Sequence, residues 1–406
     1  MPKKMKRLFE AIKNIKNSSR PVPPEGDVSD VYGGPIWPYL LIYKLWYLGL
    51  LMVIIWQWPE MNRDAFFGNM ARWPRVGEIV FGSYLTTWDG AHYMSIAEQG
   101  YIPGSPSCAF WPLWPFMMRI GSWLTGGSCL ISGMILSNLF SFFGLLWAHR
   151  LVEIHFGRRL ANRTLLLMIF YPGALFFQFP YTESLFLFLM TGFLLSLENR
   201  NWFMVYLLGL LLPVTRSVGL FLLIPLVWYF WVCLKNEKDL GLGMKCFLVS
   251  VPIQGFLLYL FSMNMAAGDP MEAFQVQYHW GTNNANNLFD LPKFLLAFFD
   301  LRSWHDYSGS LLDRIFFVYS LPSLVLLWWY KRDWFWLGVV LCIFPAMIAT
   351  YISYIRYLAV AFPVILGWAL ILDWVRSRTA VLVIYMVLLG LHAVLLWRHI
   401  NSYWAG

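Results

Sequence analysis

Long apolar runs are the feature that most constrains this chain. They fall at about residues 37–57, 129–149, 164–181, 183–198, 202–215, 217–234, 245–266, 312–330, 334–353, 357–374 and 379–397. A helix that crosses a bilayer needs roughly 20 consecutive apolar residues, so several of these runs are short for that purpose. The pattern predicts an all-α polytopic membrane protein of about eleven spanning helices.

Composition supports this class. Hydrophobic residues make up 59% of the 406 residues, charged residues make up 13%, and the mean hydropathy is +0.56. A soluble globular domain has about 25% charged residues. The formal charge of +8 would suit a nucleic-acid partner, but the Lys and Arg residues cluster at the ends of the apolar runs. Orientation in a membrane explains that placement better, and it excludes a nucleic-acid-binding protein.

The basic clusters also predict an orientation. They lie at residues 3–20, 150–163 and 235–245, and they alternate with two long loops at about 58–128 and 267–311. Cytoplasmic segments are enriched in Lys and Arg, so the N-terminus is expected inside and both long loops outside. Residues 1–36 are predicted to form a cytoplasmic basic amphipathic segment on the anionic leaflet, or alternatively a solvated tail, and residues 37–406 the transmembrane domain.

Processing signals and cysteines add little. The basic start is followed by Pro21, Pro23 and Pro24, so no cleavable signal peptide is expected. The glycosylation patterns at Asn17 and Asn162 fall on the predicted inner side. None of the five cysteines has Cys-x-x-Cys spacing. Cys108 and Cys129 flank one outer segment and would either pair or serve as small apolar side chains.

The stretch from Thr87 to Tyr101 places Asp89, His92 and Glu98 just outside the first spanning segment. Asp89 would be the N-cap of a short helix that Gly100 ends. It would also suit a general base held at a helix end, with His92 one turn away on the same face. The two roles are compatible.

The pattern Trp-Asp-Gly-x-x-Tyr-x-x-Ile-Ala-x-x-Gly-Tyr at 88–101 is followed by Ala-Phe-Trp-Pro-Leu at 109–113 and Pro-Tyr-Thr-Glu-Ser at 180–184. It resembles the PIG-V mannosyltransferases, glycosyltransferase family 76 of the GT-C superfamily, and their prokaryotic relatives. The resemblance implies a GT-C fold with a long first extracytoplasmic loop and a polyprenyl-phosphate sugar donor. It also implies an acidic base in that loop, here Asp89. Eukaryotic members act on glycosylphosphatidylinositol, an acceptor that the resemblance alone does not carry over.

A departing phosphate needs fixed cations, and two arginines lie at predicted outer ends of apolar runs. Arg216 follows Val-Thr and Arg356 follows Tyr-Ile. A planar guanidinium suits phosphate, so both are candidates for donor binding. The alternative is that each extends to the lipid headgroups.

The remaining candidates are substrate-binding side chains. Glu183, between two apolar runs, would bind acceptor hydroxyls or hold Arg216, or else be a water-exposed turn residue. His279 and Trp280, in the second long loop, would contact phosphate or stack on a sugar, or else be ordinary loop residues. His92 and Glu98 are also predicted to bind substrate. Asp89 and Glu98 are nine residues apart without an Asp-x-Asp pattern, so neither a metal nor another cofactor is expected.

The sequence thus predicts a membrane glycosyltransferase, located in a prokaryotic cell membrane. It would transfer a hexose, expected to be mannose, from a polyprenyl-phosphate donor to a lipid-linked or otherwise membrane-presented acceptor on the extracytoplasmic side. The reaction would proceed with inversion and without a metal. A transporter or lipid flippase is the rival class, and an acyl carrier-dependent transferase using His92 is a third. Charges gathered at one membrane face favour the enzyme.

Overall fold

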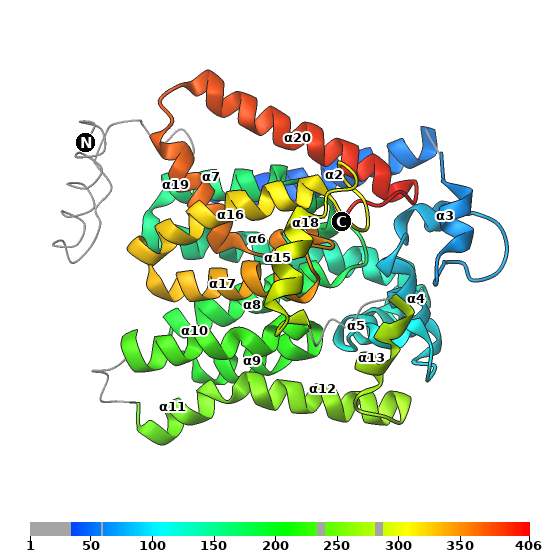
Figure 1. Ribbon diagram of the computed structural model, residues 1–406, viewed down its shortest axis with the longest axis horizontal. Helices are drawn as coiled ribbons and strands as arrows, with labels where there is room; N and C mark the ends of the chain where they lie inside the picture. Colours follow the sequence, from blue (N-terminus) through cyan, green and yellow to red (C-terminus); the bar gives the residue numbers. More distant parts are fainter. Residues whose placement is uncertain (1–33, 58–59, 234–239, 281–286) are drawn as a thin grey trace.

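The computed structural model describes residues 34–57, 60–233, 240–280 and 287–406, and these are almost wholly helical (Figure 1). Within them, strand-type pairing is limited to an isolated bridge between Ser303 and Ser310. The predicted all-α class is therefore confirmed. The basic segment expected at the N-terminus lies outside the described residues as far as residue 33.

The regular elements follow one another along the chain with short connections. In order they are α2 (Trp37–Gln57), α3 (Arg63–Gly68), η1 (Phe81–Leu85), α4 (Asp89–Gln99), η2 (Pro106–Ala109), α5 (Leu113–Ser122), α6 (Cys129–Phe156), α7 (Arg158–Phe170), η3 (Pro172–Phe177), α8 (Thr182–Glu198), α9 (Trp202–Thr215), η4 (Ser217–Leu222), α10 (Leu223–Trp228), η5 (Tyr229–Cys233), α11 (Leu242–Val249), α12 (Val251–Ala267), α13 (Glu272–Gln275), η6 (Val276–Trp280), α15 (Leu291–Phe299), α16 (Leu311–Tyr330), α17 (Arg332–Ile348), α18 (Tyr354–Leu358), α19 (Phe362–Trp374) and α20 (Arg378–Ile400).

Helices α2, α6, α16 and α20 are each long and apolar enough to cross a bilayer. Helices α11 and α12 pass the same test together, although the chain bends by 41° between them, so up to five such spans are present in the described residues. The chain is therefore an integral membrane protein. The count of eleven stays a prediction, because helices such as α9 and α19 are apolar but shorter.

One predicted run differs from the structure. The run at 164–181 is not one helix, because α7 ends at Phe170 and a 3-10 turn with irregular backbone continues to Tyr181. Pro172 lacks the N–H that an α-helix needs, and Tyr171 before it has the extended ψ of 134° that a following proline favours. Every residue from Tyr171 to Tyr181 is buried. We call residues 171–181 the inner segment.

Capping side chains set several helix starts. Ser128, Asn201, Ser310 and Ser377 each accept a hydrogen bond from the backbone N–H three residues on, at 3.2 Å in every case. Such bonds satisfy an amide that has no partner within the helix. Gly157, with φ of 81°, ends α6 and lets α7 return along it.

The two ends of the long helices carry different structures: short helices at one end and turns with paired charges at the other. The short helices α3, α4, α5 and α13 gather at one end of them, on the right in Figure 1. The turns after α6, α8 and α19 meet at the other end, where Arg163 pairs with Asp373 at 2.8 Å and His155 with Glu198 at 2.8 Å. Of the predicted inner loops, the basic turn at 150–163 thus lies at the opposite end of the helices from α4.

Cys108 and Cys129 are both buried and unpaired. The predicted alternative of small apolar side chains is confirmed for these two residues, and the disulfide alternative is wrong.

A substitution at Gly173 can test how closely the inner segment packs against its neighbours. A Cβ there would lie 2.4 Å from the Ile355 carbonyl oxygen and 2.8 Å from the Tyr171 ring. Gly173→Ala is therefore expected to lower stability by about 1–3 kcal/mol, the usual cost of overpacking. Gly49→Ala in α2 is the control, because nothing lies within 4 Å of its Cβ position. Thermal unfolding in detergent measures both, and equal melting temperatures for the two variants would contradict the close packing.

Candidate active site

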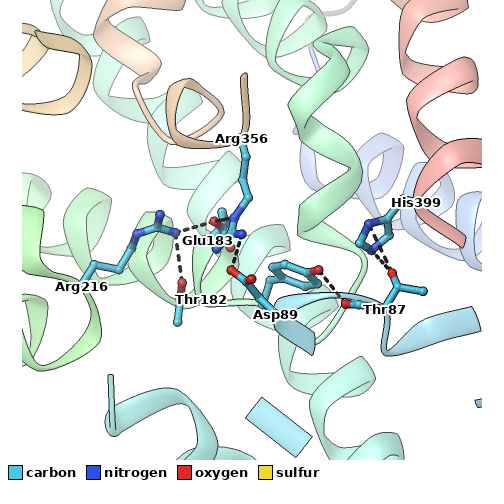
Figure 2. A network of polar contacts seen from close by, with 8 residues as sticks. Thr87, Asp89, Thr182, Glu183, Arg216, Arg356 and His399 are labelled. Atoms are coloured by element: carbon cyan, nitrogen blue, oxygen red, sulfur yellow. Dashed lines mark hydrogen bonds and ion pairs between the residues drawn. The ribbon is translucent and has the colours of Figure 1, made fainter. Parts of the chain in front are cut away.

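Four charged side chains form a continuous row at the end of the bundle where α4 lies. Glu183 accepts hydrogen bonds from Arg216 Nη1 and Arg356 Nε, each at 2.5 Å. Arg356 Nη1 also donates to Asp89 Oδ2. The order Arg216, Glu183, Arg356, Asp89 is visible in Figure 2. These residues come from the starts of α4 and α8, the end of α9, and α18, so four separate parts of the chain meet here.

Asp89 is the first residue of α4, and the preceding Trp88 is the N-cap residue, with no side-chain capping bond. The predicted N-cap role of Asp89 is therefore wrong. Trp88 has φ of 51°, a conformation that L-residues rarely adopt. Its indole N–H donates to the Tyr403 carbonyl at 3.2 Å, and its ring packs edge-on against Trp404. This sharp turn points the Asp89 carboxylate at Arg356 instead of at the helix backbone. Gly100 ends α4 as predicted.

Glu183 lies in the first turn of α8, directly after the inner segment. Its side chain is 0% exposed, so the alternative of a water-exposed turn residue is wrong. The predicted contact with Arg216 is present, and Arg356 is a second partner. A carboxylate at this depth needs such partners, because an isolated buried charge is very costly.

The two arginines approach Glu183 from opposite sides. Arg216 follows α9 in an extended conformation and also donates to Thr182 Oγ1 at 3.0 Å. Arg356 lies over the ring of Tyr181, with its Cζ 4.9 Å from the ring centroid. Their side chains are only 12% and 7% exposed, so the alternative of arginines reaching to headgroups is wrong for both.

Two acids and two arginines give this row a formal charge of zero. Arg216 uses Nη1 for both of its bonds to described residues, so its other guanidinium N–H groups remain available to a ligand. Asp89 is 22% exposed at the side chain, the most of the four. The row therefore presents both a carboxylate and a guanidinium to any molecule that binds beside it.

A cavity of about 560 Å³ opens beside the row. Its lining includes the polar side chains of Asp89, Thr182, Arg216 and Arg356. Aromatic side chains form a second part of the wall, namely Trp88, Tyr93, Phe110, Trp111, Tyr307, Tyr357 and Trp404. A third part is aliphatic or apolar and lies between η4 and α17, with Val218, Leu220, Phe221, Leu341, Pro345 and Ile348. The volume is within the range of small-molecule sites.

His92 lies on the cavity wall one turn after Asp89. Its ring stacks on Phe110 with centroids 4.4 Å apart, and Nδ1 lies 3.0 Å from Ser107 Oγ. Burial lowers the pKa of His92 to about 4, although the charge of Asp89 opposes the shift. The imidazole is therefore neutral at physiological pH. It suits a hydrogen bond to a hydroxyl better than an ion pair with phosphate.

Two predicted binding residues, Glu98 and His279, do not join this group, and the side chain of a third, Trp280, is not described. Glu98 lies at the far end of α4 and accepts a hydrogen bond from the Trp73 indole at 2.9 Å, outside the cavity lining. His279 Nε2 lies 3.1 Å from the Gly104 carbonyl oxygen, so it connects the two long outer loops. Trp280 ends η6, and its side chain lies outside the described residues.

Other cavity residues were not predicted from sequence. Trp88 and Tyr357 adjoin Asp89 and Arg356 in the chain, so their positions could have been inferred from those motifs. Tyr307 and Trp404 come from distant segments, and their rings pack edge-on with centroids 4.9 Å apart. No local pattern in the sequence marks these two residues.

Comparisons with solved structures give two likenesses. The chain resembles ArnT from Cupriavidus metallidurans bound to undecaprenyl phosphate, with a TM-score of 0.48 and 14% identity, over 87% of this chain and 63% of that one. It also resembles the Archaeoglobus fulgidus oligosaccharyltransferase in complex with Zn and sulfate. That likeness has a TM-score of 0.47 and 14% identity, over 89% of this chain and 53% of the other.

Comparison of the sequence with known proteins finds relatives in one protein family. The chain is 32% identical to GPI alpha-1,6-mannosyltransferase 2 of Cricetulus griseus over 36% of its own length and 32% of that protein. It is also 32% identical to the Rattus norvegicus protein of the same name, over 40% of this chain and 35% of that protein. The match thus spans about a third of the length of these relatives. Residues 61–262 also match the family described as Mannosyltransferase (PIG-V). Through this stretch, which contains Asp89, Glu183 and Arg216, the chain belongs to the PIG-V mannosyltransferase family.

Proposed function

We propose that this protein is a membrane glycosyltransferase that transfers a hexose from a polyprenyl-phosphate donor to a membrane-presented acceptor. One observation carries the proposal most directly: Asp89, Arg216 and Arg356 line a cavity whose lining is otherwise largely apolar. The family and the names of the matched relatives support mannose as the sugar. The acceptor is proposed only as a lipid-linked or otherwise membrane-presented hydroxyl.

In the proposed reaction the acceptor hydroxyl gives its proton to the Asp89 carboxylate. Its oxygen attacks the anomeric carbon from the face opposite the phosphate, and the bond between that carbon and the phosphate oxygen breaks. The electron pair leaves with the polyprenyl phosphate, which gains one negative charge. Arg216 and Arg356 stabilise that charge as it develops. Direct displacement inverts the anomeric configuration, and no metal or other cofactor takes part.

The two other walls of the cavity suit the rest of the substrates. Apolar side chains of η4 and α17 would accommodate the first isoprene units of the donor. Aromatic rings such as those of Trp88, Trp111 and Trp404 would face the sugars, because aromatic rings offer flat apolar surfaces with polar edges.

A transporter or flippase is less well supported by the same charges. A translocation path would be expected to place ionisable groups at several depths within the spans. Here Asp89, Glu183, Arg216 and Arg356 form one connected row (Figure 2), and Lys44, in the middle of α2, is bonded to protein groups. An acyl carrier-dependent transferase is also less well supported, because it would need a basic catalytic histidine, and the pKa of His92 is lowered by burial.

We further propose that the cavity faces the extracytoplasmic side. The paired basic turns, with Arg159 and Arg163 beside Asp373, lie at the end of the helices opposite Asp89. Cytoplasmic loops are enriched in Lys and Arg, so that end is assigned to the cytoplasm.

Single cysteines test this orientation. Glu78→Cys and Gln275→Cys, in the two long outer loops, should react with an impermeant maleimide in intact cells, whereas Arg376→Cys should react only after permeabilisation. All three side chains are exposed. The background should lack Cys246, which is exposed, and Cys233. The background without an introduced cysteine is the blank. Labelling of Arg376→Cys in intact cells, or protection of either loop, would contradict the orientation.

The arginines are tested through donor kinetics. Arg216→Ala and Arg356→Ala should each raise the donor KM or lower kcat by about tenfold or more, because each removes a charge-assisted bond to phosphate. Lysine at either position should restore only part of the loss, since it cannot bind as a planar fork. Arg302→Ala is the control, because Arg302 is exposed and pairs with Asp300 outside the cavity. Wild-type kinetics in both arginine variants would remove these residues from the mechanism.

Asp89→Asn tests the catalytic base. The variant keeps the shape of the side chain but cannot take a proton from a hydroxyl, so turnover should fall by about 10²–10⁴-fold while donor binding is retained. Asp64→Asn is the matched control, because Asp64 is an exposed acid in the first turn of α3 in the same outer loop. Sugar transfer by both purified variants is measured beside their melting temperatures. Near-normal turnover by Asp89→Asn would mean that another group is the base.

A further inference from the structure

Lys44 is a basic residue in the middle of α2 that the proposed reaction does not use. It is 3% exposed and belongs to the buried stripe of α2, formed by Leu40, Lys44, Tyr47, Leu51 and Ile55. The 3- and 4-residue spacing puts this stripe on one face of the helix. A lysine at such a position is expensive and needs polar partners, so it is a candidate for a specific role.

Those partners lie on α6 and the inner segment. Lys44 Nζ donates to Ser141 Oγ at 2.7 Å, to Gln178 Oε1 at 3.2 Å and to the Phe177 carbonyl at 3.4 Å. Ser141 Oγ lies 3.1 Å from the same Phe177 carbonyl. Ser141 Oγ also lies 2.6 Å from the Ser137 carbonyl oxygen of its own helix, and its single hydrogen serves one carbonyl at a time. Lys44 is therefore the donor that connects α2 both to Ser141 and to the Phe177 carbonyl.

The inner segment needs such donors because its backbone is not α-helical. Side chains of α6 supply two more, since Ser137 donates to the Phe179 carbonyl at 2.6 Å and Asn138 to the Gln178 carbonyl at 3.3 Å. A carbonyl group buried at membrane depth without a hydrogen-bond partner is strongly unfavourable. Irregular backbone is therefore kept here by side chains of neighbouring helices.

A second contact from α2 reaches the start of the inner segment. Tyr47 OH lies 2.7 Å from His392 Nε2, and His392 Nδ1 lies 3.0 Å from the Tyr171 carbonyl oxygen. With Nδ1 protonated, His392 donates to that carbonyl and accepts from the tyrosine. Two residues three apart on one face of α2 thus connect to the inner segment: Lys44 directly at Phe177 and Gln178, and Tyr47 through His392 at Tyr171.

The inner segment leads directly into the active site. Thr182 and Glu183 follow it and bond to Arg216, and Glu183 also bonds to Arg356. At its start, the Tyr171 hydroxyl donates to the Ile355 carbonyl at 2.9 Å, next to Arg356 in the chain. A displacement of residues 177–179 would therefore move the carboxylate that holds both arginines.

We propose that Lys44 is a positioning residue for the donor-phosphate site and acts through the inner segment on Glu183. The proposal rests on the proposed function for its kinetic consequence, because the phosphate-binding role of the two arginines belongs to that function. Its structural part, that Lys44 fixes residues 177–181, can be measured without any activity.

The test uses Lys44→Met, which keeps an unbranched apolar chain but removes the donor. Amide hydrogen exchange of the purified protein should become about tenfold faster over residues 177–181. The donor KM for a polyprenyl-phosphate mannose should rise about fivefold or more, with a smaller change in kcat. Ser137→Ala, which removes the donor to the Phe179 carbonyl, is a milder second variant expected to change both quantities in the same direction.

Leu51→Ala is the control, because Leu51 is 0% exposed in the same stripe of α2 and is purely apolar. It should lower the melting temperature without changing exchange over 177–181 or the donor KM. Unchanged exchange in Lys44→Met, or an equal increase in Leu51→Ala, would overturn the proposal. Faster exchange with a wild-type donor KM would show that Lys44 only stabilises the fold. If the wild-type protein transfers no sugar, the proposed function fails, and exchange alone still decides whether Lys44 fixes the segment.

Discussion

The buried carboxylate of Glu183 is the contact on which the rest of the site depends. It is 0% exposed and bonded to two guanidinium groups, so removing any member of this group would leave an uncompensated buried charge. Breaking a buried ion pair in this way usually costs about 3–5 kcal/mol. Because Arg216 ends α9 and Arg356 lies in α18, Glu183 fixes two separate segments relative to α8. Asp89 is then fixed through Arg356. Glu183 therefore fixes the position of the proposed base as well as that of the proposed phosphate site.

A second constraint is the backbone of the inner segment. The chain leaves the α-helix at Tyr171 and resumes it at Thr182, and all of the intervening residues are buried. Irregular backbone at membrane depth is tolerated where protein side chains satisfy it. Ser137 and Ser141 lie four residues apart on one face of α6 and meet carbonyls of the segment. This arrangement brings an acid to the start of α8 without exposing its supporting backbone to lipid.

The sequence predicts much of this molecule, and the limits have physical reasons. Apolar runs of 14 to 22 residues predicted most helices. The outer-loop motif suggested Asp89, and positions at run ends suggested Glu183, Arg216 and Arg356. The pairings could not be predicted, because Asp89 and Arg356 are 267 positions apart. Proline at 172 and 180 was a signal that the run at 164–181 would break. Glu98 and His279 were chosen by loop position and residue type, which do not determine whether a side chain reaches the cavity.

The proposed reaction explains why Arg356 lies between two acids. Before transfer, Asp89 is ionised and Arg356 donates to it. When the acceptor proton moves to Asp89, that carboxyl becomes neutral and holds the guanidinium less strongly. In the same step the departing phosphate gains one negative unit. Negative charge would thus pass from Asp89 to the phosphate, both of which are proposed partners of Arg356, while Glu183 keeps the guanidinium in place. A fixed arginine that can pair with either anion stabilises the charge without moving, which is the condition for electrostatic catalysis by a preorganised site.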